Sequence, residues 1–339
     1  MTSPPPRPIG PVDAFQRKHR VVGFPIAVVY KYFDDQGAYL SAILTYYAFI
    51  AIFPLLLLST SILGFLLQGD EDLRDRLLNS ALSQFPIIGD QLGRPDGLQG
   101  STTAIVIGSL AALYGAMGLG QALQNAANVA WSVPRNSRAN PFLLRFRSLL
   151  FLAIGGVGIL LLAVATSVLA NPDALGADLA PTIGLVSRVV GFVLTVVIFV
   201  AVFRLISLRR AKVRAVFPGA FVTAVLWQAL QWVGNTYVRE VIGKANQVNQ
   251  TFALVLGLMV FIYIAAIMVV MGLEVNVVLR RNLYPRALMT PFTDNVILTP
   301  ADQKAYSAYA KSQRHKGFQS VEVTFEDRLP VPPVEPPAD

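Results

Sequence analysis

Five long stretches without a charged residue constrain the fold of this chain more than any other feature. Each is at least 24 residues long, and they occupy residues 36–69, 97–134, 148–172, 215–238 and 245–273. About 20 apolar helical residues suffice to cross the hydrocarbon core of a bilayer. Charged residues make up 14% of the chain, against about 25% in an ordinary soluble domain. The sequence therefore excludes a soluble enzyme and predicts an all-α, polytopic integral membrane protein.

The hydrophobic pattern predicts six transmembrane helices in one domain of residues 37–282. Their expected ranges are about 37–67, 101–130, 148–170, 182–208, 215–237 and 250–279. Residues 14–36 are basic at their start and too short to span, which predicts an interfacial helix broken by Pro25. Acidic residues in 70–92 predict a short amphipathic helix outside the bilayer. Proline-rich composition predicts a disordered tail at 1–13 and a cytoplasmic, mostly disordered tail at 283–339.

The distribution of basic residues predicts the orientation. With the N-terminus on the cytoplasmic side, 22 of the 28 Lys and Arg residues lie inside, five lie outside, and Arg188 lies within a span. Cytoplasmic loops carry such an excess of positive charge. We therefore expect both termini in the cytoplasm and a bacterial inner-membrane location.

Ionisable residues inside the spans are candidate functional residues, because they are costly in hydrocarbon. At 1.5 Å per residue, Glu274 and Arg204 each lie about 8 to 9 Å inward from the first clearly cytoplasmic arginine. Gln121, Asn125 and Asn128 recur at helical spacing on the second span, at a similar depth. This pattern predicts an inner polar cluster in which Glu274 pairs with Arg204, or is satisfied by asparagine, water or a proton.

A second polar stripe is expected near the outer side. It consists of Arg188 on the fourth span with Gln228, Gln231 and Asn235 on the fifth. Two interpretations stay open for both clusters. They line vestibules of a transporter, or they hold helices together while Arg204 snorkels to the interface.

Four sequence motifs resemble the YihY/BrkB family, with an overall pattern closest to its YhjD-like branch. They lie at residues 41–58, at 122–135, at 218–227, and at Gly272-Leu273-Glu274-Val275-Asn276, and the resemblance spans about residues 35–282. It implies a six-helix protein of the bacterial cytoplasmic membrane, with suggested roles from envelope lipid export to serum resistance. The motif positions, besides Asn128 and Glu274, are Tyr46, Tyr47, Pro54, Trp131, Pro134, Arg135, Trp227 and Asn276.

The residues do not support the label ribonuclease BN that members of this family have carried. A metal-dependent nuclease needs clustered His, Asp or Glu ligands, but the two histidines, His19 and His315, lie in the terminal segments. The chain has no cysteine, no phosphate-binding loop and no serine-nucleophile motif. We expect neither enzymatic activity, nor a cofactor or metal, nor a nucleic-acid partner.

Two functions remain compatible with the sequence. The first is a transporter or flippase-like protein for an anionic envelope lipid or lipopolysaccharide-type precursor, with anionic membrane lipids as partners of the basic residues. The alternative is a membrane scaffold or envelope-organising protein that does not transport.

Overall fold

The computed structural model is mainly helical in the part of the chain that it describes. It describes residues 9–66, 102–140, 142–150, 180–207, 211–242 and 247–326, with residues 154, 156–158, 161 and 244. The elements are α1 (Pro11–Lys18), α2 (Arg20–Asp34), α3 (Gly37–Leu66), α6 (Thr102–Ala130), η2 (Arg135–Ser137), α8 (Ala180–Ile206), α9 (Val213–Tyr237), η5 (Val238–Ile242), α10 (Gln247–Arg281) and α11 (Pro300–Ser312). No strand occurs among these residues, which confirms the all-α expectation for them.

Three helices in the described part are long and apolar enough to cross a membrane. They cover Arg188–Ile206 in α8, Val213–Glu240 in α9 and η5, and Phe252–Arg281 in α10. A shorter apolar helix, Gly37–Ile52, lies within α3. The expected third span, 148–170, and the expected outer helix, 70–92, lie mostly or wholly outside the described residues. The chain is therefore a membrane protein with three candidate spans in its described part.

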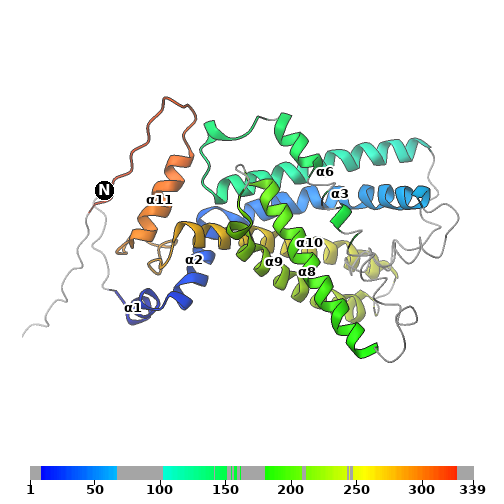
Figure 1. The fold of residues 1–339 in the computed structure, drawn as a ribbon, viewed down its shortest axis with the longest axis horizontal. Coiled ribbons are helices and arrows are strands. Elements are labelled where there is room, and N and C mark those ends of the chain that lie inside the picture. The colour runs from blue at the N-terminus through cyan, green and yellow to red at the C-terminus, as the bar shows by residue number, and fades with distance from the viewer. Residues whose placement is uncertain are drawn as a thin grey trace, which may run out of the picture.

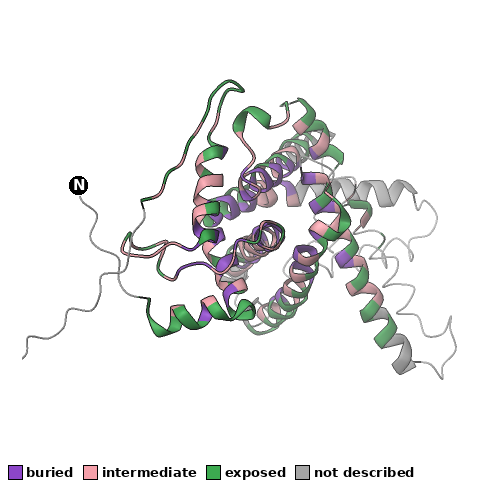
Figure 2. Cartoon of the chain, turned by 60° about the vertical axis from the view of Figure 1, so that its left-hand side comes forward, coloured by how far each residue is buried: buried purple, intermediate pink, exposed green. Residues whose placement is uncertain are grey.

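Helix α10 lies at the centre of the bundle (Figure 1). It contacts α2, α3, α6 and α9, while α3 packs along α6 and α8 packs along α9. The faces that meet in the middle of the bundle are buried (Figure 2), and they contribute Phe203, Ala220, Val270, Leu273 and Val277 to one apolar core. Because α10 touches most of the other long helices, a polar residue on its inner-facing side is removed from solvent on all sides.

Glycines allow α9 and α10 to approach unusually closely. A Cβ atom on Gly219 would lie 2.0 Å from the carbonyl oxygen of Gly272, so only glycine fits at position 219. The backbone N–H of Gly219 follows Pro218, which lies inside α9, and donates to Oδ1 of Asn276 at 2.7 Å. A motif residue of α10 therefore binds the backbone of α9 beside a proline.

The N-terminal segment, expected as a helix or hairpin broken at Pro25, breaks at a different residue. It forms two helices, and the break is at His19, whose backbone is extended with φ −106° and ψ 100°. Pro25 lies inside α2. Since proline loses only one hydrogen bond there and its side chain is exposed, the helix continues through it.

The C-terminal segment also differs from the expectation of a mostly disordered tail after residue 283. Helix α11 forms within it and packs at the same end of the molecule as α1 and α2 (Figure 1). Its start carries a capping box in which the Thr299 side chain and the Asp302 side chain each accept from the other's backbone N–H. The low apolar content of this segment does not reveal its order, because buried polar contacts of Arg286 and Asp302 hold it in addition to the few apolar residues, such as Leu283 and Ala305, that join the core.

We predict that Gly219→Ala lowers the stability of the detergent-solubilised protein by about 1 to 3 kcal/mol, as expected for overpacking of a close contact. The added methyl group would push α9 away from α10 and strain the Gly219–Asn276 hydrogen bond. Thermal unfolding followed by fluorescence measures the effect. Gly156→Ala is the matched control, because no atom lies within 4 Å of a Cβ at that position. An unchanged midpoint in Gly219→Ala would contradict the close approach.

Candidate functional site

Three buried charged side chains meet where α2, α6 and α10 come together. Lys31 is on the last turn of α2, Asp35 is its C-cap residue, and Glu274 is on α10. The exposed fractions of their side chains are 3%, 1% and 0%. We call these three residues the inner charge site. Glu274 is the only acidic residue in α3, α6, α8, α9 and α10, so its burial here is the most costly polar feature of the bundle.

The ammonium group of Lys31 organises this site. Its Nζ donates to Oδ2 of Asp35, four residues later, and to the carbonyl oxygen of Ala130 at 3.2 Å. Ala130 is the last residue of α6. The same Nζ lies 3.6 Å from Oε2 of Glu274. One cation therefore ties the end of α6 and the inner half of α10 to the N-terminal helix.

The carboxyl group of Glu274 is incompletely satisfied. Both of its oxygens are buried and accept no hydrogen bond from a described donor. Its Oε2 and Oδ2 of Asp35 both lie within ion-pair distance of the same Nζ of Lys31, so the two carboxyl groups are close neighbours. Two carboxylate groups cannot hydrogen-bond to each other unless one carries a proton. The site thus presents two carboxyl groups to one ammonium.

Burial and charge act differently on Lys31 and Asp35. Burial alone would lower the pKa of Lys31, but the carboxylates of Glu274 and Asp35 outweigh it and raise that pKa above its ordinary value. For Asp35, burial is the larger effect and raises the pKa of the carboxyl, although Lys31 opposes it. Lys31 is therefore firmly charged, and Asp35 binds a proton more readily than an exposed aspartate.

A second buried ion network lies directly beside the inner charge site. Arg286 is completely buried, and its guanidinium donates to Oδ2 of Asp34 at 2.8 Å and to Oδ1 of Asp302. Asp302 also accepts from the backbone N–H groups of Ala287 and Thr299. The two carboxylates raise the pKa of Arg286, although burial opposes them. Because Asp34 and Asp35 are neighbours in sequence, α11 is linked to the inner charge site through two adjacent residues.

The loop after α6 completes this end of the molecule. Arg281 donates to the carbonyl oxygen of Trp131 and lies over its ring at 6.0 Å. Arg135 donates to the side-chain oxygen of Gln313, beyond α11, at 3.1 Å. The N-terminal helices, the loop after α6 and α11 thus share one end of the bundle.

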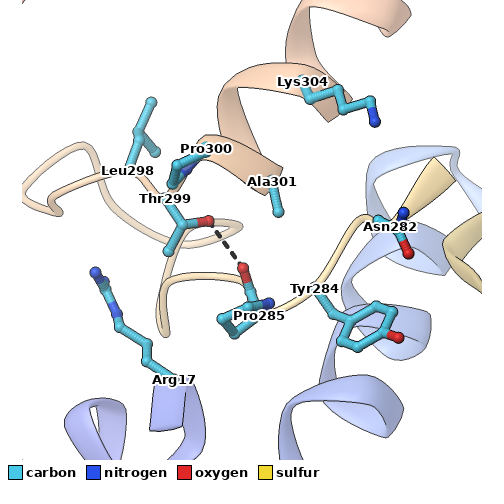
Figure 3. Close-up of a pocket in the computed structure, with 9 residues that line it drawn as sticks. All are labelled: Arg17, Asn282, Tyr284, Pro285, Leu298, Thr299, Pro300, Ala301 and Lys304. Carbon is cyan, nitrogen blue, oxygen red and sulfur yellow. Dashed lines mark hydrogen bonds between the residues drawn. The ribbon is translucent and has the colours of Figure 1, made fainter. Parts of the chain in front are cut away.

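A pocket of about 550 Å³ opens at this end between α1 and α11. Figure 3 shows the side chains of Arg17 and Lys304 on opposite sides of it. Arg17 is paired with Asp13 at 2.7 Å, and Lys304 donates to the carbonyl oxygen of Arg281. The Thr299 hydroxyl donates to the carbonyl oxygen of Pro285 at 2.9 Å. Both cations keep internal partners while they flank the opening.

The predicted pairing of Glu274 with Arg204 is wrong. Arg204 is exposed, and its Nε donates to the carbonyl oxygen of Ala211 at 3.2 Å, whereas Glu274 is buried beside Lys31. Equal depth in a span does not place two residues on facing sides of their helices. Glu274 is buried, but the depth argument could not choose its partner.

The structure divides the predicted polar face of α6. Asn128 is buried, but Gln121 and Asn125 are exposed, and Asn125 accepts from Arg138 at 3.2 Å. Gln124, which lies between them in sequence, is buried and donates to the carbonyl oxygen of Leu144 at 3.0 Å. The predicted inner cluster therefore does not assemble as a unit.

The predicted outer cluster does not form a buried site either. Arg188, Gln228 and Asn235 are exposed, and Gln231 is half-buried on α9. Their outward orientation places three of these polar side chains on the surface of α8 and α9 rather than between helices.

The family-motif residues have mostly packing roles in the described structure. Asn276 binds α9, as described above, and Trp227 contacts the rings of Phe199 and Phe261 at 6.4 Å and 6.0 Å. Tyr47 packs against Tyr46 at 5.2 Å and fills the space above Gly118. Pro134 is the N-cap residue of η2, which contains Arg135. The side chain of Pro54 lies outside the described residues.

Sequence reasoning missed Lys31, Asp34, Asp35, Arg286 and Asp302. Lys31 and Arg286 served only as topological charges in the count of basic residues. The available signal was the four-residue spacing of Lys31 and Asp35, which puts both on one face of a helix. No pattern along the sequence connects Asp34 with Arg286, 252 residues away.

Comparison with known families gives one match. The family model described as Virulence factor BrkB matches residues 28–294, a range that includes all three residues of the inner charge site. No curated protein and no solved structure matches the chain. Among the described residues, no group of three or more His, Cys, Asp or Glu side chains is arranged to hold a metal ion.

We predict strong energetic coupling between Lys31 and Glu274 and none between Arg204 and Glu274. Lys31→Met strands buried carboxylates, a loss of about 3 to 5 kcal/mol, and Glu274→Gln in the same chain relieves part of it. The free energy of unfolding of the double variant should therefore fall less than the sum of the single effects. The matched pair, Arg204→Met with Glu274→Gln, should add within about 0.5 kcal/mol. Coupling between Arg204 and Glu274, together with additive effects of Lys31 and Glu274, would mean that Glu274 pairs with Arg204 after all.

Proposed function

The chain belongs to the BrkB family, and from this premise we propose that it is a six-span transport protein of the bacterial inner membrane, with both termini in the cytoplasm, for an anionic, lipid-like envelope component. The observation that carries the proposal is the inner charge site. Burying Lys31, Asp35 and Glu274 costs free energy that an apolar contact would not, and ionisable groups inside a membrane bundle mark substrate or ion pathways by default.

The charge at the same end of the molecule supports an anionic substrate. Exposed basic side chains concentrate there, on the loop after α6, at the end of α10, and on and after α11: Arg135, Arg280, Lys304, Lys311 and Lys316. Each basic residue near a membrane surface attracts anionic headgroups by about 1 kcal/mol. Arg17 and Lys304 flank the pocket between α1 and α11, which gives a phosphate-bearing headgroup a place to enter.

One observation favours the alternative, a scaffold that does not transport. The Arg286 network fixes α11 to α2 through a fully buried ion pair with Asp302 and a partly buried one with Asp34. Such a fixed surface at one end of the bundle suits a constant binding partner. The scaffold function accounts for Arg286, but it gives no reason for the unsatisfied carboxyl group of Glu274.

The orientation predicts which sites a membrane-impermeant thiol reagent reaches in intact cells. The chain has no cysteine, so single cysteines can be introduced at exposed positions. A cysteine at Lys244, beyond α9, should react from outside, whereas cysteines at Ser137 and Lys316 should react only after the membrane is permeabilised. Labelling of the cysteines at positions 137 and 316 from opposite sides would overturn an even number of spans between them, and with it the proposed six-span topology.

Transport is tested with purified protein in vesicles of phosphatidylethanolamine and phosphatidylglycerol. Fluorescent phosphatidylglycerol in the inner leaflet should become accessible to an external quencher faster than in protein-free vesicles, and fluorescent phosphatidylcholine should not. Glu274→Gln should abolish the acceleration, because it changes the charge of the buried site. Glu240→Gln, an exposed residue paired with Lys244, is the control and should retain it. Absence of any acceleration would favour the scaffold.

A further inference from the structure

The charges around Glu274 do not balance. Within the inner charge site and the adjacent network there are three cationic side chains and four carboxyl groups: Lys31, Arg281 and Arg286 against Asp34, Asp35, Glu274 and Asp302. Helices α3 and α6 contain no Asp, Glu, Lys, Arg or His. The charged residues of α8 and α9 are Arg188, Arg204 and Arg214, and all three are exposed. The packed helices therefore bring no further cation to the site.

Two of the three cations already have other partners. Arg286 is shared by Asp34 and Asp302, and Arg281 donates to the carbonyl oxygen of Trp131. Among the described cations, Lys31 is the one within ion-pair distance of Asp35 and Glu274, although Arg281 also attracts Asp35. Lys31 hydrogen-bonds to Asp35, and its 3.6 Å separation from Glu274 is an ion-pair distance but too long for a good hydrogen bond. Both oxygens of Glu274 are therefore left without a hydrogen-bond donor among the described residues, in a site that is closed to water.

We propose that Asp35 and Glu274 share a single bound proton, and that this proton is the coupling ion of the transport function proposed above. The O–H group of one carboxyl donates to an oxygen of the other, which gives one of the two buried oxygens of Glu274 a hydrogen-bond partner. The pair then carries one negative charge, which the ammonium of Lys31 neutralises. The position of both carboxyl groups beside one ammonium agrees with this arrangement, and so does the raised pKa of Asp35, which burial causes.

Release of the proton changes the stability of the closed site. The O–H bond breaks, the electron pair stays on the carboxylate, and the proton passes to water on whichever side the site has opened. Two carboxylates then face one ammonium, and like charges in a low-dielectric site repel. Closure without a proton is disfavoured, whereas closure with a proton is allowed. Because closure depends on the bound proton, a proton gradient can bias the movement of the helices.

Infrared spectroscopy tests the shared proton directly. The wild-type protein in detergent at neutral pH should show the carbonyl band of one protonated carboxyl group, and the band should shift in D2O and disappear at high pH. Asp35→Asn and Glu274→Gln should each remove the band, because the remaining carboxylate pairs with Lys31 alone. Glu240→Gln is the control and should keep it. The wild-type titration needs no variant, so it stands even where a variant fails to fold.

The outcomes separate this proposal from the transport function. A wild-type protein without the band at neutral pH overturns the shared proton, and so does a band that survives in both single variants. A band that both variants remove, in a protein that moves no lipid in the vesicle assay, supports the proton site and overturns transport. Where lipid moves, its rate should depend on an imposed pH gradient in wild type and lose that dependence in Glu274→Gln. A rate that ignores the gradient overturns the coupling.

Discussion

The buried ammonium group of Lys31 is the contact on which the arrangement of this end of the molecule depends. It joins α2 to the last carbonyl group of α6 and to Glu274 in the middle helix. The C-terminal end of a helix leaves carbonyl groups without partners, and a cation is favoured there. Lys31 therefore gives the last carbonyl group of α6 a hydrogen-bond donor and also places a positive charge beside Glu274 of α10. An apolar residue at position 31 would leave both unsatisfied in a site that water does not reach.

The terminal segments belong to the same polar assembly. Asp34 and Asp35 follow each other at the end of α2, and they point to two different cations, Arg286 and Lys31. A shift of α11 acts on Asp34 through Arg286, and a shift of α10 acts on Asp35 through Glu274. The two movements therefore act on adjacent residues, Asp34 and Asp35. Helix α11 is thereby connected to the buried carboxyl group of Glu274 through a chain of ion pairs and the adjacent residues Asp34 and Asp35.

Particular residues show how much of the fold and of the inner charge site could be predicted from the sequence. Apolar run length predicts the ranges of α8, α9 and α10, because the bilayer fixes the length of such helices. The free-energy cost of a charged side chain in hydrocarbon singles out Glu274 as a candidate site residue. Its partner could not be predicted, because Lys31 is 243 residues away in sequence and lies in a segment that reads as an interfacial helix. The polar face of α6 was assigned to Gln121, Asn125 and Asn128, but the buried polar side chains are Gln124 and Asn128. One residue is about 100° of helix rotation, and no periodic signal in an almost uniformly apolar helix fixes that angle.

The Arg286 network and the inner charge site differ in how completely their carboxylate oxygens are hydrogen-bonded. This difference assigns a structural role to the first and a functional role to the second. Each carboxylate that binds Arg286 accepts a charged hydrogen bond, and Asp302 is further satisfied by backbone N–H groups. A network whose carboxylates are satisfied to this degree stabilises one arrangement, although the buried Nη1 of Arg286 has no hydrogen-bond partner among the described residues. At the inner charge site, Glu274 accepts no hydrogen bond from a described donor and shares its only nearby cation. A site with that imbalance is stable only in one protonation state, so its arrangement responds to protons or to a charged ligand, whereas the Arg286 network holds the surrounding helices still.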